Sequence, residues 1–251
     1  MAPFSIQHLS EQATLQSNLI QTKKTLGKLL QTALDWSEIW ALLIPLMVLL
    51  FKRKYPRLLK PVVIYLWVAL GINFIIDMIW IYKENLPGWL QSNNPFYNLH
   101  AVARFACFSI FFMMLPQPSF THLKKMLLAG SVIFILVNFI FVENFFNPDH
   151  LSGNLLATEA YLLLVYCMQY YLSELRDDGR SIFGGPDFWI VTGLSIYVVI
   201  NFFIFLFYLP MLNFDPMLAD KMWNFHNIAF IIFCIFITKA FYGPFRNQYT
   251  V

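Results

Sequence analysis

The chain has 251 residues, of which 59% are hydrophobic and only 12% are charged, and its formal net charge at pH 7 is +3. An average soluble domain is roughly 45–50% hydrophobic and about 25% charged, so this composition excludes an ordinary soluble protein and predicts an integral membrane protein. The net charge is small and spread over the predicted loops, which argues against nucleic-acid binding.

Residues 1–35 precede the first long apolar run and form a segment of their own. Its apolar residues recur at near-helical spacing between Gln, Ser and Lys residues; they are Ile6, Leu9, Ala13, Leu26, Leu29, Leu30 and Ala33. This pattern predicts an amphipathic helix that lies on the outer leaflet or caps a helix bundle. A solvated and partly disordered tail is the alternative. We expect no cleavable signal peptide, because no short apolar stretch here ends in small residues.

Seven apolar runs follow, at residues 37–51, 61–82, 96–115, 123–142, 152–173, 187–209 and 219–241. Most contain the roughly 20 residues that a helix needs to cross a hydrocarbon layer ~30 Å thick. The first run is short and contains Pro45, so its boundary is the least defined. Proline and glycine residues separate the runs. The prediction is an all-α polytopic membrane protein with a seven-transmembrane-helix bundle over 36–242 and a short cytoplasmic tail at 243–251.

Basic residues are distributed unequally between the two sides of the predicted bundle. The richer side holds Lys52, Arg53, Lys54, Arg57, Lys60, Lys124, Lys125, Arg176, Arg180, Lys239 and Arg246. The poorer side holds Lys23, Lys24, Lys28, Lys83 and Lys221. Since basic residues accumulate on the cytoplasmic side, we expect the N-terminus outside and the C-terminus in the cytoplasm.

Polar residues inside the predicted helices gather at one depth, in the outer half of the membrane on this orientation. Charged side chains at the middle of a membrane helix cost roughly 2.5–3.5 kcal/mol on insertion scales, so intramembrane ionisable groups call for a function. The inner halves of the second, fourth, sixth and seventh helices are almost purely apolar. The candidate ligand-binding residues are Asp77, His100, Arg104, Glu159, Asn201, His226 and Asn227.

This convergence has two interpretations. In the first, the residues line a polar cavity open to the outside that binds a small anionic or zwitterionic molecule. Arg104 is then the two-pronged donor to a carboxylate or phosphate. In the second, they form interhelical hydrogen bonds and one Asp77–Arg104 ion pair that hold the bundle together.

Motifs for catalysis and for metal binding are absent from the sequence. It contains no HExxH, no GxSxG, no glycine-rich phosphate loop and no Cys/His metal spacing. We therefore expect no enzyme activity, no bound metal and no cofactor. Lys239 lies near the predicted cytoplasmic end of the seventh helix, which argues against a retinal Schiff base in the middle of that helix.

The last two predicted helices contain the stretches PDFWIVTGLSIYVVINFFIFLF and MWNFHNIAFIIFCIFITKAF. They resemble the end of the seven-helix N-terminal membrane region of bacterial sensor histidine kinases. The matching positions are Phe188, Trp189, Gly193, Asn201, Trp223, His226 and Asn227. In that family a kinase domain follows the membrane region, whereas this sequence stops at Val251 and has no ATP-binding motif. The resemblance implies a sensor module that signals through a separate protein.

The leading hypothesis is therefore a multi-pass sensor or receptor-like protein of a bacterial inner membrane. It would be surrounded by membrane lipid, bind a small ligand in the outward-facing pocket, and signal through a cytoplasmic or membrane partner. A small-solute transporter or channel is the first alternative, although we find no internal repeat and no polar path through the inner half. An oligomeric effector that perturbs the bilayer is the second.

Overall fold

The structure is a computed structural model that describes residues 4–52, 54–117, 120–142, 151–176 and 184–243. Throughout these residues the regular elements are helices and no β-strand occurs, which confirms the predicted all-α class. Most of the predicted cytoplasmic tail, residues 244–251, lies outside the described residues, as do Arg53 and Arg180 of the predicted basic side.

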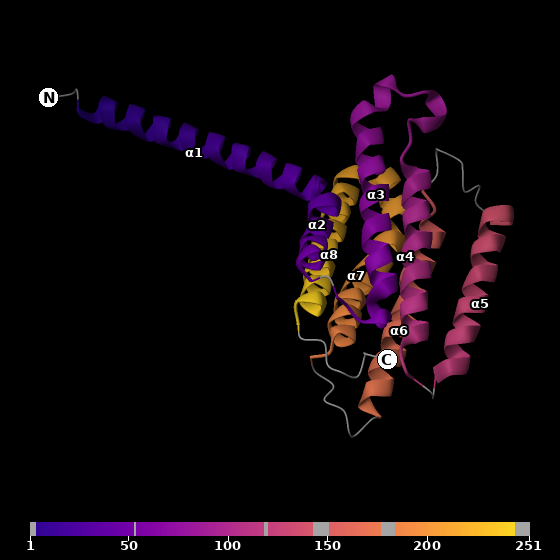
Figure 1. Ribbon diagram of the computed structural model, residues 1–251. Helices are drawn as coiled ribbons and strands as arrows, with labels where there is room; N and C mark the ends of the chain where they lie inside the picture. Colours follow the sequence, from indigo (N-terminus) through magenta and orange to yellow (C-terminus); the bar gives the residue numbers. More distant parts are fainter. Residues whose placement is uncertain (1–3, 53, 118–119, 143–150, 177–183, 244–251) are drawn as a thin grey trace.

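Eight α-helices follow one another in this described part of the chain (Figure 1). They are α1 (Phe4–Asp35), α2 (Ser37–Phe51), α3 (Lys60–Tyr82), α4 (Asn94–Met114), α5 (Thr121–Val137), α6 (Gly153–Leu175), α7 (Pro186–Phe214) and α8 (Pro216–Tyr242). Short turns of 3-10 helix flank α3 and precede α4 at Arg57–Leu59, Lys83–Asn85 and Gly88–Leu90, and a π-helical segment, Asn138–Val142, continues α5.

Helices α3 to α8 include six stretches that are long and apolar enough to cross a membrane. The count reaches seven only if the last part of α1 and the whole of α2 together form one span, and these two helices meet at an angle of 62°. Helix α2 alone has 15 residues and is roughly 22 Å long at ~1.5 Å per residue, which is short of a ~30 Å hydrocarbon layer. The described residues thus contain six or seven candidate spans, as expected of a polytopic helical membrane protein.

The helix starts follow from local sequence. Proline occupies one of the first positions of α3, α4, α7 and α8, where its missing N–H costs no hydrogen bond. Ser152 caps α6 by accepting from Leu155 N at 3.2 Å, and Asp215 caps α8 by accepting from Leu218 N at 3.1 Å. The predicted boundary at 209 is wrong. Helix α7 continues past Pro210 for one more turn and ends at Phe214.

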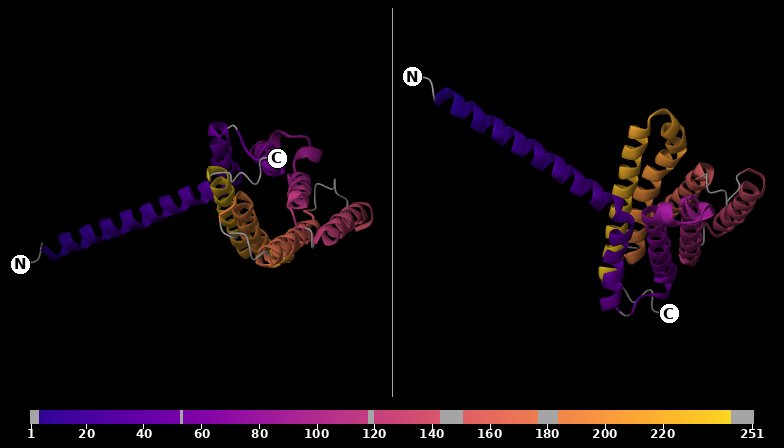
Figure 2. Two further views of the ribbon diagram at one scale, coloured as in Figure 1. Left: turned by 60° about the horizontal axis from the view of Figure 1, so that its bottom comes forward. Right: turned by 90° about the horizontal axis from the view of Figure 1, so that it is seen from above.

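The helices form a ring, since α2 packs on α3, α3 on α4, α4 on α6, α6 on α7, α7 on α8, and α8 on α2 again. Figure 2 shows this arrangement from two further directions. Helix α5 lies outside the ring beside α4 and α6, and only 17% of its most apolar window is buried, against 50% in the other five candidate spans. Helix α1 projects away from the bundle (Figure 1, Figure 2).

Aromatic side chains fill much of the space that the ring of helices encloses. Tyr65 of α3, Phe108 of α4 and Phe233 of α8 are fully buried, with ring centroids 5.0 Å apart for Tyr65–Phe108 and 5.6 Å for Phe108–Phe233. Tyr197 of α7 stacks on Phe233 at 5.2 Å. These contacts tie α3, α4, α7 and α8 together directly beside the polar residues described next.

Candidate functional site

A layer of buried polar side chains crosses the ring of helices. We use the name polar layer for Glu38, Asn73, His100, Arg104, Glu159, Tyr197, Asn201, His226 and Asn227, all of which are buried. They come from α2, α3, α4, α6, α7 and α8, so every helix of the ring contributes at least one. Seven of these nine residues are linked to one another by the contacts described next, whereas Asn227 bonds to α1 and His100 has no hydrogen bond to the other described members.

Arg104 of α4 is engaged by two neighbouring helices. Its Nε and one terminal nitrogen donate to the two carboxylate oxygens of Glu159 in α6, at 2.7 and 2.5 Å, and both side chains are 3% exposed. Its other terminal nitrogen donates to the Tyr197 hydroxyl at 2.6 Å, and the guanidinium carbon lies 5.0 Å from the centre of that ring. A bidentate pair of this kind is the geometry in which two buried charges compensate each other best.

His226 of α8 connects three helices in a hydrogen-bonded chain. Its Nε2 lies 3.2 Å from Glu38 Oε1 in α2, and its Nδ1 is in contact with Asn201 Oδ1 in α7. The Asn201 amide nitrogen donates to the Tyr197 carbonyl at 2.8 Å. The neighbouring α3 joins this chain through Asn73 Nδ2, which donates to the Glu38 carbonyl at 3.1 Å.

The protons of this chain follow from its geometry. A carbonyl can only accept, so Asn201 must turn its nitrogen to the Tyr197 carbonyl and its oxygen to His226. His226 Nδ1 must then carry hydrogen. The contact between Nε2 and Glu38 needs one further proton, either on the imidazole or on the carboxyl group. In both arrangements the Glu38–His226 pair has no net charge, as is also true of Arg104–Glu159.

His100 of α4 has unused hydrogen-bonding capacity. Its ring lies parallel to that of Tyr65, with an interplanar angle of 8° and centroids 6.0 Å apart, and its residue is 5% exposed. Neither His100 Nε2 nor the Tyr65 hydroxyl has a hydrogen-bond partner among the described residues. A buried polar atom without a partner costs about 1–3 kcal/mol, so a polar molecule in an adjoining cavity would be stabilised by a hydrogen bond to this nitrogen.

A small cavity opens where these groups meet. Its lining consists of Glu38, Tyr97, His100, Arg104, Leu156, Phe205, Trp223 and His226. About 10 Å³ of it is open, which is about the room that one water molecule requires. In this conformation the pocket is therefore nearly closed, and a larger molecule would enter only if the surrounding helices separated.

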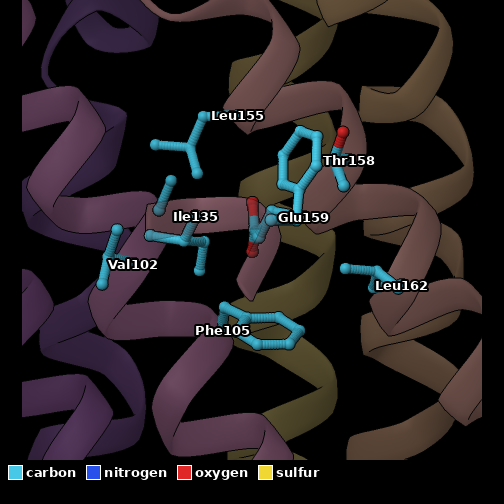
Figure 3. A pocket seen from close by; sticks show the side chains of 9 residues that line it. Val102, Phe105, Ile135, Leu155, Thr158, Glu159 and Leu162 are labelled. Carbon is cyan, nitrogen blue, oxygen red and sulfur yellow. The ribbon is translucent and has the colours of Figure 1, made fainter. Parts of the chain in front are cut away.

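A second cavity of about 10 Å³ lies on the other side of the ion pair, between α4, α5 and α6. Figure 3 shows the Glu159 carboxylate there among the apolar side chains of Val102, Phe105, Ile135 and Leu162. Glu159 thus faces Arg104 in the polar layer while apolar side chains enclose its other side. Among the described residues, the Arg104 guanidinium is the cation that compensates the Glu159 charge.

The structure gives the predicted site residues different positions. His100, Arg104 and His226 line the cavity of the polar layer. Glu159 bonds to Arg104 and Asn201 bonds to His226, but neither of them lines the cavity. Asn227 donates to the Leu34 carbonyl at 3.0 Å and thereby holds the end of α1.

Asp77 differs most from its predicted place. It is only half-buried on α3, and one of its carboxylate oxygens has no hydrogen-bond partner among the described residues. The expected structural alternative of an Asp77–Arg104 ion pair is wrong, because Glu159 occupies the guanidinium fork.

Several residues of the site were not predicted. Glu38 is the most important, since the sequence places it at the start of the first apolar run, whereas the structure places it in the polar layer. The sequence does contain a signal for Glu38. It is a charged residue two positions after Trp36, and it lies inside an apolar run that is short for a membrane span. Tyr97 and Tyr197 carried no such signal, because tyrosine is common throughout this sequence.

Lys124 was expected in a cytoplasmic loop, but it is buried in the first turn of α5. Its ammonium group donates to the carbonyls of Phe112 and Leu115 at 2.7 and 3.1 Å, and its own carbonyl accepts from the Tyr166 hydroxyl at 3.1 Å. The lysine thus caps the end of α4, because it bonds to the Leu115 carbonyl and shares the Phe112 carbonyl with Leu115 N. It therefore has a structural role at the end of the bundle away from the polar layer.

Within the described ranges, no group of three or more His, Cys, Asp and Glu side chains is placed to hold a metal ion. Comparison with known proteins gives no relative: no family model, no curated protein and no solved structure matches this chain.

Proposed function

We propose that this protein is a membrane sensor or receptor-like protein that binds a small ligand in the polar layer and signals through a separate partner. The observation that carries the proposal is His100 Nε2, which is buried, unpartnered among the described residues, and placed at a cavity beside two compensated charge pairs. Intramembrane ionisable groups in such number are characteristic of functional sites.

The geometry favours a zwitterionic or neutral dipolar ligand over a simple anion. Glu159 and Tyr197 take three of the five N–H groups of Arg104, so two remain for a ligand. Glu38 has a second carboxylate oxygen that can accept from an ammonium or amide group, and His100 adds one more polar contact. The aromatic walls, Tyr97 and Trp223, suit the apolar part of such a molecule.

The described conformation corresponds to the ligand-free state in this proposal, because its cavity has room for about one water molecule. Ligand entry would displace α2 or α8, since Glu38 and His226 both line the cavity and a single contact joins them. At the far end of the same two helices, Lys52 Nζ donates to the Tyr242 and Gly243 carbonyls at 2.6 and 2.8 Å. A shift of α8 relative to α2 would therefore change the surface at that end.

The topology of the proposal follows the basic residues. We place the polar layer in the outer half of a bacterial inner membrane and the Lys52 end in the cytoplasm, because basic residues concentrate at that end. A cytoplasmic or membrane signalling protein would contact it there. A relationship to the membrane region of sensor histidine kinases is part of this proposal and rests on the sequence pattern of α7 and α8.

A binding experiment with His100→Phe tests the proposal. Phenylalanine keeps the stack on Tyr65 but removes Nε2. We expect a panel of free amino acids to contain members that raise the unfolding temperature of the wild-type protein in nanodiscs. His100→Phe should abolish this shift while it leaves the unfolding temperature without ligand unchanged or higher. Lys125→Met, which changes an exposed residue far from the layer, serves as the matched control.

Three results would count against the proposal. An equal shift in His100→Phe would place binding elsewhere, and the absence of any shift across the panel would remove the zwitterion class. Transport of an active amino acid into proteoliposomes, abolished by His100→Phe, would favour the transporter instead.

A further inference from the structure

Helix α1 presents an apolar stripe that the bundle does not cover. Leu19, Leu26 and Leu30 are each more than half exposed, and at 100° per residue they lie within about 40° of one another around the helix. Leu29 and Ala33 widen the stripe on one side. Figure 1 and Figure 2 show α1 projecting away from the bundle, to which it is joined only near its C-terminal end.

The opposite face of α1 is polar and basic. Lys24 and Lys28 lie about 160° from Leu26 around the helix, and both are exposed. The hydroxyl groups of Thr25 and Thr32 on this side donate to carbonyls one turn back, at 2.9 and 3.0 Å. The helix therefore has one face suited to hydrocarbon and one suited to water or anionic headgroups.

Hydrogen bonds fix the level at which α1 leaves the bundle. Gln31 and Asn224 exchange two bonds, at 3.0 and 3.2 Å, and Asn227 donates to the Leu34 carbonyl. Asn224 is three residues after Lys221 on α8, which at ~1.5 Å per residue is roughly 4–5 Å along the helix. Asp220 and Lys221 are the charged residues expected at the headgroups, so α1 departs just beneath that level.

The neighbouring surface is apolar and exposed as well. Phe225 and Ile228 of α8 are exposed beside the attachment of α1, and Trp36 and Trp40 at the bend between α1 and α2 are partly exposed. Tryptophan at such a level is typical of the membrane interface. Apolar side chains are therefore exposed both on the stripe of α1 and on the bundle surface at its attachment.

We propose that residues 18–35 of α1 form an interfacial arm, whose leucine stripe inserts at the headgroup–hydrocarbon boundary of the membrane that the bundle spans. Lys24 and Lys28 face the headgroups, where anionic lipids attract them, and Lys23 at the edge of the stripe extends its ammonium group to the same level. This inference goes beyond ligand binding and does not depend on it.

Site-specific labelling tests the arm. A polarity-sensitive fluorophore is attached to Leu26→Cys or Leu30→Cys, and in matched variants to Lys24→Cys or Lys28→Cys. The background carries Cys107→Ser, because Cys107 is partly exposed whereas Cys167 and Cys234 are buried; this background without an added cysteine measures residual labelling. The full chain is reconstituted in nanodiscs of phosphatidylcholine with or without phosphatidylglycerol.

We expect blue-shifted emission and quenching by a spin-labelled lipid at Leu26→Cys and Leu30→Cys. Iodide should quench severalfold more strongly at Lys24→Cys and Lys28→Cys. Equal iodide quenching at all four positions would place the arm in water and overturn the proposal. Protection from both quenchers at the leucine positions, with disulfide cross-linking between chains, would also overturn it, because a second copy would then cover the stripe.

A second measurement does not require labelling. Trypsin cleavage after Lys24 and Lys28 should accelerate severalfold when Leu19, Leu26 and Leu30 are all replaced by glutamine in nanodiscs, and much less in detergent micelles. An unchanged cleavage rate in nanodiscs would contradict insertion of the stripe.

Discussion

Asn201 presents its amide oxygen to His226, because its amide nitrogen is committed to the Tyr197 carbonyl of the same helix. This single commitment determines which nitrogen of the histidine carries hydrogen and assigns a shared proton to the Glu38 contact. The polar layer thus has a defined direction of donors and acceptors running from α7 through α8 to α2.

Asn201→Leu should lower the free energy of unfolding by about 1–3 kcal/mol, because the buried Nδ1–H of His226 would lose its acceptor. Thermal unfolding of the purified protein in detergent measures the loss. Asn18→Leu, at an exposed position of α1, is the control and should change stability by less than about 0.5 kcal/mol. Equal effects of the two substitutions would mean that the Asn201–His226 contact contributes nothing specific.

Removal of either partner of the buried ion pair should be severe. Arg104→Met alone leaves Glu159 with a buried charge, and Glu159→Met alone does the same to Arg104, so each should cost about 3–5 kcal/mol. The double variant has no uncompensated charge and should be more stable than either single variant by at least ~2 kcal/mol. The folded fraction recovered by size-exclusion chromatography measures this. Additive losses in the double variant would show that the two residues act independently.

Gly193 marks the closest approach of α7 to α8. A methyl group at this position would collide with the Phe236 side chain, whereas one at Gly71 or Gly130 would meet nothing within 4 Å. Gly193→Ala should therefore destabilise the protein by about 1–3 kcal/mol through overpacking. Gly71→Ala and Gly130→Ala should be neutral or stabilise it by up to ~1 kcal/mol, since alanine favours helix. Melting temperatures that move in the same direction for all three would contradict the close packing.

The sequence predicts the helices well and their contacts less well. Each apolar run corresponds to a helix within a few residues, because a continuous apolar stretch bounded by proline has few other stable arrangements in a membrane. Depth along each helix is readable in the same way, which is why His100, Arg104, Glu159 and Asn201 are at one level. The sequence does not show how each helix is rotated about its axis, and so it does not show which polar side chains meet. Asp77 and Glu159 are both plausible partners of Arg104 by depth, and side-chain packing selects Glu159.

Glu38 was missed for a different reason. Its depth depends on where α2 begins, and the chain bends by 62° between α1 and α2 at a position where the sequence has neither proline nor glycine. The bend is held by contacts distant in sequence, such as Asn227 with Leu34 and His226 with Glu38. No periodicity in a single segment contains that information.

Lys124 should stabilise the fold through its hydrogen bonds to backbone carbonyls, since its ammonium group is buried and not at the protein surface. Lys124→Met keeps most of the side-chain volume but removes the donor to the Leu115 carbonyl and one of two donors to the Phe112 carbonyl, which also accepts from Leu115 N. We expect a loss of about 1–3 kcal/mol in the free energy of unfolding, measured by thermal unfolding in detergent. The adjacent Lys125 is exposed, so Lys125→Met should change stability by less than about 0.5 kcal/mol. If the two variants unfold at the same temperature, the buried ammonium does not stabilise the end of α4, and Lys124 is equivalent in this respect to the exposed Lys125.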